Sequence, residues 1–216
     1  DEIKRIESLL SKYLPSSEIS ILNAKGKVKA SPETIFVIKT AQEFSRISGG
    51  AFDITVGSLV DLWGFTNRDY RIPGAQEIQS KLKVIGSDKI IVNEEENMIQ
   101  LTFPGMKVDV GGIAKGFAVD NAVKKLKEQG INSCLIALAG DIYCLGKKFG
   151  RPWRVAIRNP RGQGVFDSVH LEDRAISTSG DYEQYFIRDK KRYAHIIDPR
   201  TGYPAQTGVI SATVLA

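Results

Sequence analysis

The chain of 216 residues has few cysteines and no long apolar run, and these absences narrow its class. Cys134 and Cys144 are its only cysteines, so it has neither a CxxC pair nor the Cys and His spacing of a zinc site. We interpret them as small core residues on adjacent strands, with a disulfide as the alternative if the chain lies outside the cytosol. No apolar segment reaches the roughly 18 residues that a membrane-spanning helix needs. No linker rich in Pro, Gly or Ser, internal repeat or low-complexity tract divides the chain, which favours one domain.

The charge is mildly basic, but the chain has no pattern typical of nucleic-acid binding. The formal net charge is +5 and the isoelectric point is about 9.1. The lysines are scattered, and the longest basic run, Lys190-Lys191-Arg192, is expected at a hairpin tip. Aromatic and basic residues are not interleaved as they are on nucleic-acid-binding surfaces. We therefore expect no nucleic-acid partner, because a small anionic ligand is enough to use part of the positive charge.

Apolar spacing predicts helices mainly in the first half of the chain and strands mainly in the second. Helices are expected over 2–13, 32–48, 74–85 and from the turn at 111–112 to about 129. Strands are expected over 89–93, 98–103, 107–110, 132–138, 141–145, 152–158, 165–171, 174–178, 184–188, 192–197 and 208–215. The second helix is expected to have an apolar face of Val37, Ala41, Phe44 and Ile47. It is also expected to have a mixed face of Ile35, Ile38, Ala41, Gln42 and Ser45. This order predicts an α+β fold, a single compact domain over 1–216 with mixed or antiparallel β-sheet layers and packed helices.

The segment 109–120 (DVGGIAKGFAVD) carries the strongest indication of function. It is expected to be a strand that ends in Gly111-Gly112 and turns directly into a helix. The first amides of a helix lack intrahelical partners, and the helix dipole favours negative charge there. Lys115 adds a positive charge in the first turn. The segment therefore fits a phosphate or a pyrophosphate, with a plain tight turn as the alternative.

Three further segments combine glycine or a sharp turn with residues that carry chemistry. The segment 48–57 (SGGAFDITVG), with 62–65 after it, either shapes a pocket for a flat ring or belongs to the core. Asp141 follows a glycine among apolar residues, so it is either hydrogen-bonded to backbone amides or close to a metal. His195 ends a strand close to Asp198 in sequence, which makes it a candidate general base, with a structural histidine as the alternative.

The remaining polar residues limit the kind of metal and ligand. Acidic residues without nearby basic partners are hard oxygen ligands, which fit Mg²⁺ or Ca²⁺ rather than zinc. The second histidine, His170, lies between two apolar residues of an expected strand and is placed on a solvent face. From residue chemistry alone, the chain is interpreted as an enzyme that handles a phosphorylated ligand with a hard divalent cation.

Six segments, taken in order, resemble the ApbE family, the FAD:protein FMN transferases. The matching segments are 13–23 (YLPSSEISILN), 50–65 (GAFDITVGSLVDLWGF), 109–120 (DVGGIAKGFAVD), 139–146 (AGDIYCLG), 176–186 (ISTSGDYEQYF) and 195–204 (HIIDPRTGYP). They follow the family's order and cover nearly the whole chain. The resemblance implies an ApbE-like (T-fold-like) architecture. The family's usual Gly-Gly-Asp is Ala139-Gly140-Asp141 here, a small change that we expect to be tolerated.

The resemblance implies a Mg²⁺-dependent flavin transferase. FAD, as the substrate, would be cleaved at its pyrophosphate, FMN would pass to a Thr or Ser hydroxyl of an acceptor flavoprotein, and AMP would leave. Positioning and charge neutralisation by the cation would lower the barrier. Two alternatives use the same residues: an FAD pyrophosphatase, in which water replaces the acceptor hydroxyl, and a protein that binds FAD without chemistry. His195 and the segment 177–181 favour chemistry.

The resemblance also assigns roles to single residues. The residues implied to contact FAD are Tyr13, Ala51, Phe52, Asp53, Asp109, Lys115 and Ile197, the last through its backbone. Gly112 is implied to offer its main-chain carbonyl to Mg²⁺, and His195 to assist deprotonation of the acceptor hydroxyl. The glycine turn is therefore expected to present a carbonyl to the cation as well as amides to a phosphate.

The resemblance further implies a setting and a larger protein. Many family members face the periplasm or the outer side of a membrane, often by a lipid anchor, and modify subunits of membrane redox complexes. These are the expected location and partners. Family members carry a short strand before the position of Asp1, and they continue past Ala216 into a segment whose Asp and Thr supply metal ligands. We therefore expect the domain to be truncated at both ends here, with an incomplete cation site.

Overall fold

The computed structural model describes all of residues 1–216 and divides into two compact units. The sheet unit consists of Asp1–Ile3, Lys115–Tyr185 and Gln206–Ala216. The helical unit consists of Lys4–Ala114 and Phe186–Ala205. Helices and antiparallel sheets occur as the α+β prediction requires. The expectation of a single domain stays a prediction.

The sheet unit is built around a four-stranded antiparallel sheet in the order β11-β8-β5-β4. Its strands are β4 (Cys134–Leu138), β5 (Asp141–Leu145), β8 (Arg174–Gly180) and β11 (Ser211–Leu215). A second antiparallel pair consists of β6 (Trp153–Arg158) and β7 (Val165–Leu171). The long helix α6 (Ala114–Glu128) ends at Gly130, whose φ of 78° lies in the left-handed region that glycine tolerates best.

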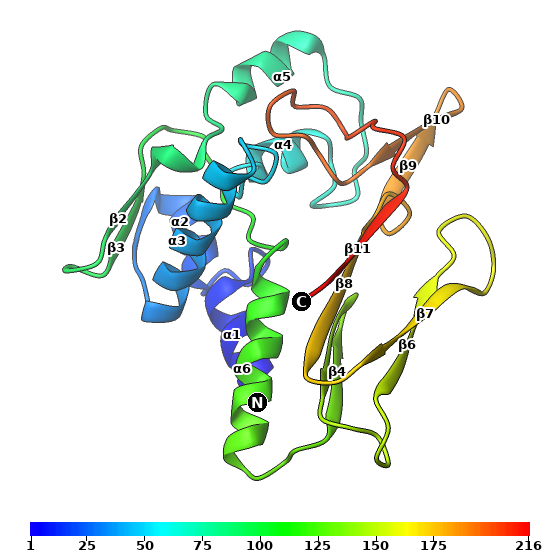
Figure 1. The fold of residues 1–216 in the computed structure, drawn as a ribbon. Coiled ribbons are helices and arrows are strands. Elements are labelled where there is room, and N and C mark those ends of the chain that lie inside the picture. Colours follow the sequence, from blue (N-terminus) through cyan, green and yellow to red (C-terminus); the bar gives the residue numbers. More distant parts are fainter. The chain divides into compact units, whose positions relative to one another are not determined.

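Two apolar clusters cover the two faces of strand β5. Leu145 packs with Val119 and Val123 of α6. Its neighbour Cys144 packs with residues of the β6–β7 pair, among them Val155. Because neighbouring residues of a strand point to opposite faces, α6 covers one face of the four-stranded sheet and the β6–β7 pair covers the other (Figure 1).

The register of this sheet separates the two cysteines. Cys134 pairs with Leu145, and Leu135 pairs with Cys144. The two thiols therefore point to opposite faces of the sheet, and both cysteines are free. Burial raises the pKa of each thiol, and the pKa of Cys144 is raised further by Cys134. The prediction of adjacent strands is confirmed, and this register does not allow the disulfide.

The helical unit holds the other elements. They are α1 (Glu2–Leu10), α2 (Glu18–Lys25), β1 (Lys27–Lys29), α3 (Pro32–Ile47), α4 (Gly57–Leu62), α5 (Ala75–Leu82), a 3-10 turn (Ser87–Lys89), β2 (Ile90–Asn93), β3 (Met98–Leu101), β9 (Tyr185–Arg188) and β10 (Lys191–Ala194). The first residues of α1 and of β9 belong to the sheet unit. Strands β1, β3 and β2 form an antiparallel sheet, and β9 pairs with β10. No helix has the length and apolar character needed to cross a membrane.

Several element predictions differ from the structure. Helix α1 ends at Leu10, earlier than expected, and α2, β1 and α4 have no counterpart in the predictions. The segment 107–110 is not a strand and makes only an isolated bridge between Lys107 and Val56. Strand β10 ends at Ala194, so His195 lies just after it.

The apolar face predicted for α3 is correct for Val37 and Ala41, which are buried, and wrong for Phe44 and Ile47. Phe44 and Ile47 are 54% and 65% exposed, whereas the buried stripe includes Thr34, Ile38 and Ser45. The spacing of that stripe is helical, but two of its members are polar. Ser45 can be buried because its hydroxyl donates a hydrogen bond to the buried carboxylate of Asp53.

Candidate functional site

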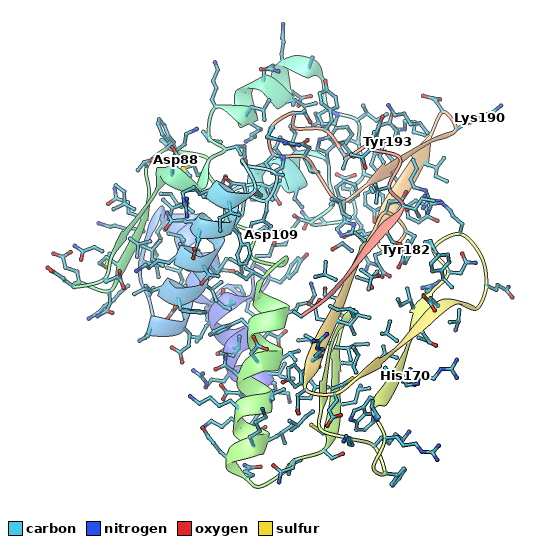
Figure 2. The ribbon with its side chains drawn as sticks, viewed as in Figure 1. Asp88, Asp109, His170, Tyr182, Lys190 and Tyr193 are labelled. Carbon is cyan, nitrogen blue, oxygen red and sulfur yellow. The ribbon has the colours of Figure 1, made fainter.

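Asp109 lies in the irregular segment just before α6 (Figure 2), and the Asn23 side chain and a neighbouring loop, rather than a sheet, hold it in place. Asn23 of α2 binds both polar backbone groups of Val108: its amide donates to the carbonyl at 2.9 Å, and its side-chain oxygen accepts from the N–H at 2.6 Å. The N–H of Asp109 donates to the Ile54 carbonyl at 2.7 Å. These bonds fix the start of the predicted glycine turn.

The segment 53–57 runs beside 107–109. Besides the bond from Asp109 to Ile54, the bridge between Val56 and Lys107 joins the two segments. A Cβ added to Gly57 would lie 2.7 Å from the Lys107 carbonyl oxygen, so only glycine permits this approach. Two of the glycine-bearing motifs of the sequence therefore meet within the helical unit.

The Asp109 carboxylate has one internal donor on each oxygen. Oδ1 accepts from the Gly111 N–H at 2.9 Å, and Oδ2 accepts from Lys12 Nζ at 2.7 Å. Burial opposes the charge on Lys12, but the Asp109 carboxylate outweighs it and leaves the pKa of Lys12 above its ordinary value. Lys12 therefore carries its positive charge at neutral pH beside a residue predicted to contact FAD.

Most amides of the glycine turn bond within the turn. The Gly111 N–H donates to Asp109, and those of Ile113 and Ala114 donate to the Val110 carbonyl at 2.9 and 2.8 Å. The turn is therefore less open to a phosphate than a row of orphan amides would be. A Cβ on Gly112 would lie 3.1 Å from the Phe52 ring, which brings two predicted site residues together.

Asp53 is buried, and its carboxylate organises the surrounding loop. Oδ1 accepts from the N–H and the hydroxyl of Thr55 at 2.8 and 2.6 Å. Oδ2 accepts from the Ser45 hydroxyl at 3.0 Å and from the Ser87 N–H at 2.8 Å. Its neighbours differ, since Ala51 is exposed and Phe52 is half-buried, with its ring 6.4 Å from that of Phe44. The side chain of Asp53 therefore supports the loop, and Ala51 and Phe52 are the accessible residues.

His195 and Ile197 enter the core of the helical unit from the segment after β10. Ile197 is 7% exposed and belongs to a cluster with Trp63 and Phe65. The His195 ring is half-buried and meets the Phe65 ring edge to face, with centroids 6.5 Å apart. Trp63 is fully buried and donates from Nε1 to the Gly202 carbonyl at 2.9 Å. Trp63 is therefore a core residue, as one of the two alternatives predicted, and does not line a pocket for a flat ring.

The sheet unit contains a second group of predicted residues. Asp141 pairs across the sheet with Ser177, whose hydroxyl donates to its carboxylate. Lys115 Nζ lies 3.7 Å from the same carboxylate. Thr178 of β8 pairs with Thr213 of β11, and their hydroxyl oxygens are 2.9 Å apart. The expectation of backbone amides as partners is wrong: the Asp141 carboxylate accepts from the Ser177 hydroxyl and forms an ion pair with Lys115.

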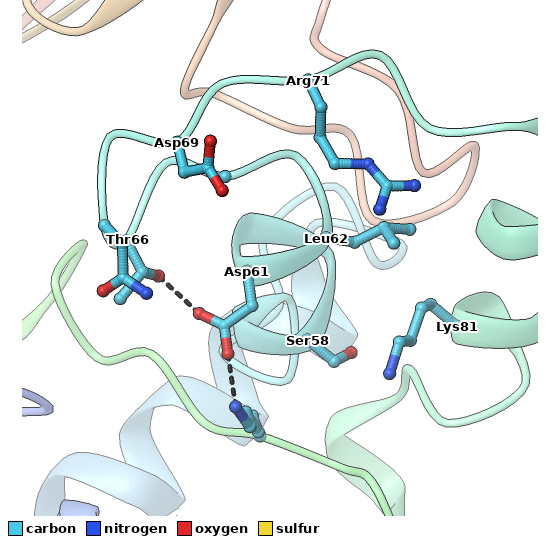
Figure 3. Close-up of a pocket in the computed structure, with 10 residues that line it drawn as sticks. Ser58, Asp61, Leu62, Thr66, Asp69, Arg71 and Lys81 are labelled. Carbon is cyan, nitrogen blue, oxygen red and sulfur yellow. Dashed lines mark hydrogen bonds and ion pairs between the residues drawn. The ribbon is translucent and has the colours of Figure 1, made fainter.

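A pocket of about 410 Å³ opens beside α4 in the helical unit (Figure 3). Its lining residues are Ser58, Asp61, Leu62, Gly64, Thr66, Asn67, Asp69, Arg71, Lys81 and Lys107. Asp61 accepts from the Thr66 hydroxyl and from Lys107, each at 2.5 Å. Burial would raise the pKa of Asp61, but these two donors outweigh it and lower that pKa. Lys12 also donates to Thr66 at 3.3 Å, so this pocket connects to Asp109.

The structure thus groups some predicted residues and adds two that the sequence did not indicate. Within the helical unit, Lys12 joins Tyr13 and Asp109, because its Nζ lies 5.2 Å from the centre of the Tyr13 ring. Asn23 lies in the matching segment 13–23, and Lys12 immediately precedes it. Nothing in their residue types indicates their partners. No group of three His, Cys, Asp or Glu side chains is placed to hold a metal ion.

Known proteins resemble this chain over its whole length. The family model described as the ApbE family matches residues 1–216. Two curated relatives, each named FAD:protein FMN transferase, come from Haemophilus influenzae (34% identical over 226 residues) and Vibrio cholerae (36% identical over 221 residues). Both alignments cover 99% of this chain but only 65% and 66% of the relatives, so the chain spans about two thirds of their length.

A solved structure agrees with the fold. The crystal structure of an ApbE protein from Thermotoga maritima matches with a TM-score of 0.94 at 39% sequence identity. The match covers 100% of this chain and 71% of that one. The arrangement of helices and antiparallel sheets described above is therefore that of solved ApbE proteins.

Proposed function

The chain belongs to the ApbE family, and from this we propose that it transfers FMN from FAD to a hydroxyl of an acceptor protein. The acceptor oxygen would attack the phosphorus of the FMN half of FAD. A new P–O bond would form as the bond from that phosphorus to the bridging oxygen breaks. AMP would leave with the bridging oxygen, and the acceptor hydroxyl would lose its proton to a base.

The observation that carries this proposal is the group formed by Tyr13, Lys12 and Asp109. Tyr13 is 65% exposed, so a flat ring of FAD has a surface to stack on. The neighbouring Asp109 carboxylate uses one acceptor site on each oxygen internally and keeps others for ligand donors. Phe52, which contacts Gly112, offers a second aromatic ring. An aromatic surface beside an oriented carboxylate suits FAD, whose flat rings can stack on the surface and whose hydroxyl groups can donate to the carboxylate.

His195 is the residue proposed to take the proton of the acceptor hydroxyl. An unperturbed imidazole changes its protonation near neutral pH, which suits a general base. The ring is half-buried against Phe65, and this contact limits its orientation. Ile197, two residues later, is anchored in the core, so the segment carrying His195 has a fixed end.

Mg²⁺ is proposed as the cation of this reaction, where it would neutralise charge on the pyrophosphate. The residue of this chain that would hold it is Gly112, through its main-chain carbonyl. The chain offers no cluster of acidic side chains for a full set of protein ligands. Mg²⁺ usually keeps several waters and binds substrate phosphates alongside one or two protein groups, which is compatible with a single ligand from Gly112.

The direct test mixes the protein with FAD, Mg²⁺ and a candidate acceptor peptide that contains Thr and Ser. A mass gain of one FMN on the peptide, with AMP released, supports the transferase. Release of AMP and free FMN without a peptide adduct would instead identify an FAD pyrophosphatase. FAD binding without turnover would identify a binding protein, and no FAD binding would overturn the whole proposal.

A substitution of His195 separates catalysis from binding. We expect His195→Ala to reduce the rate of FMN transfer by about 10²–10⁴-fold, the range typical of a lost general base. FAD affinity, measured by titration of flavin fluorescence, should change little. An equal loss of affinity and rate would assign His195 to FAD binding. The matched control is His170→Ala, because His170 is exposed on β7 (Figure 2).

The partners and location that follow from this function are proposals as well. Flavoprotein subunits of membrane redox complexes are the proposed acceptors, and the periplasm or the outer face of the cell membrane is the proposed location. Both rest on family resemblance. Fractionation of cells that produce the whole protein, followed by immunodetection, would test the location, and recovery in the cytosolic fraction would contradict it.

A further inference from the structure

Lys12 contacts two residues of the proposed FAD site, although the sequence gives no sign of it. Its Nζ lies 2.7 Å from Asp109 Oδ2 and 5.2 Å from the centre of the Tyr13 ring. The side chains of Lys12 and Asp109 are only 16% and 18% exposed. By contrast, the pair of Lys39 and Glu94 is 49% and 61% exposed. Water therefore screens the Lys12–Asp109 pair much less than an ordinary surface pair.

The Lys12 side chain has a second hydrogen-bond partner, Thr66. Its Nζ donates to the Thr66 hydroxyl at 3.3 Å, and that hydroxyl donates to Asp61 at 2.5 Å. Asp61 also accepts from Lys107 (Figure 3). The chain of contacts from Lys107 to Asp109 thus alternates in charge, and the Thr66 hydroxyl links Asp61 to Lys12. Lys12 Nζ is fixed by Thr66 on one side, so it can fix Asp109 on the other.

This arrangement determines what the Asp109 carboxylate offers to a ligand. Gly111 occupies one acceptor site of Oδ1, and Lys12 occupies one acceptor site of Oδ2. An ionised carboxylate has about four acceptor sites, so each oxygen keeps one for an external donor. With both oxygens tethered, the plane of the carboxylate is set before a ligand arrives. Removal of the Lys12 tether would leave the carboxylate free to rotate and its charge uncompensated.

We propose that Lys12 is a positioning residue of the FAD site, which acts by fixing the Asp109 carboxylate to accept hydrogen bonds from hydroxyl or amino groups of FAD. The inference rests on the proposed function, because FAD is the ligand. A purely structural role for Lys12 is the competing explanation. The two differ in whether Lys12 affects FAD binding through Asp109 or independently of it.

A double-mutant cycle separates the two explanations. FAD affinity is measured by isothermal titration for the unmodified protein, Lys12→Met, Asp109→Asn and the combined variant. We expect Lys12→Met to weaken FAD affinity about tenfold, and the combined variant to bind within about twofold of Asp109→Asn alone. Lys12→Arg keeps the charge and the hydrogen-bond donors, and it should recover affinity to within about threefold of the unmodified protein.

The controls identify each kind of failure. Lys39→Met breaks a surface pair and should leave FAD affinity unchanged. Thermal melting of each variant checks that it is folded at the temperature of the affinity measurement. Unchanged affinity in Lys12→Met, or losses that add independently in the combined variant, would overturn the inference while leaving FAD binding by the unmodified protein intact. An unmodified protein that does not bind FAD would overturn the proposed function, and the inference with it.

Discussion

At the scale of single residues, Asp53 is the side chain whose structural role the contacts define most completely. The residue is 6% exposed, and its carboxylate accepts four hydrogen bonds, from Ser45, Ser87 and both donors of Thr55. Hydrogen bonds to a charged group contribute about 1.5–3 kcal/mol each, and their loss leaves buried donors without a partner. Asp53 therefore stabilises the loop that brings Phe52 to Gly112.

We expect Asp53→Ala to lower the free energy of unfolding by about 3–5 kcal/mol, because four donors lose their acceptor at once. Asp53→Asn should cost less, since one oxygen remains as an acceptor. Urea denaturation followed by circular dichroism measures both changes. The exposed Asp88 provides the control: Asp88→Ala should change stability by no more than about 0.5 kcal/mol. Equal stabilities of Asp53→Ala and the unmodified protein would contradict the structural role.

The sequence predicted residue types at this site better than it predicted their partners. The pattern identified the glycines and acidic residues of 48–57 and 109–112, because glycine pairs next to carboxylates are unusual in an ordinary core. It could not indicate that Lys12 faces Asp109 or that Asn23 binds Val108, since those pairs are 97 and 85 residues apart. Such partners follow only from the folded backbone.

At the scale of elements, the predictions succeeded where apolar periodicity is strong and failed where polar contacts decide. The strands of the four-stranded sheet were predicted close to their observed bounds because apolar residues recur along them. The segment 107–110 was predicted as a strand from the same signal, yet its polar backbone groups bind Asn23 and the loop at 53–57. On α3, Phe44 and Ile47 were wrongly expected to be buried, whereas the polar Ser45 is buried with a buried partner.

The hairpin between β4 and β5 allows a test of local geometry. Its two-residue loop consists of Ala139 and Gly140, with φ angles of 47° and 99°. The left-handed region costs a residue with a Cβ about 1–2 kcal/mol, whereas glycine enters it freely. Part of the gain on introducing glycine is lost to the greater freedom of the unfolded chain.

We therefore expect Ala139→Gly to raise the free energy of unfolding by about 0.5–1 kcal/mol. Urea denaturation measures the change. Ala137→Gly, within β4, is the matched control and should lower stability, since glycine weakens a strand. A loss of stability in Ala139→Gly similar to that in Ala137→Gly would show that the turn is not strained. The expectation that alanine is tolerated at this position agrees with a cost of this size.

At the scale of the whole molecule, the two units are separate in their contacts but interleaved along the chain. The chain passes between them after Ile3, Ala114, Tyr185 and Ala205. The first three of these points lie within α1, at the start of α6 and within β9. Neither unit is therefore a continuous stretch of sequence. Three elements contribute residues to both, so unfolding of one unit would disrupt elements of the other.

We expect the chain to unfold in a single cooperative transition, as the prediction of one domain requires. Each unit contains one of the two tryptophans, Trp63 in the helical unit and Trp153 in the sheet unit. In Trp153→Phe, fluorescence reports on the helical unit alone, and in Trp63→Phe it reports on the sheet unit alone. Within each variant, the urea midpoint from fluorescence should equal the midpoint from circular dichroism, even where the substitution shifts both. A fluorescence midpoint that departs from the circular dichroism midpoint in either variant would show that the units unfold separately, and the single-domain prediction would then be wrong.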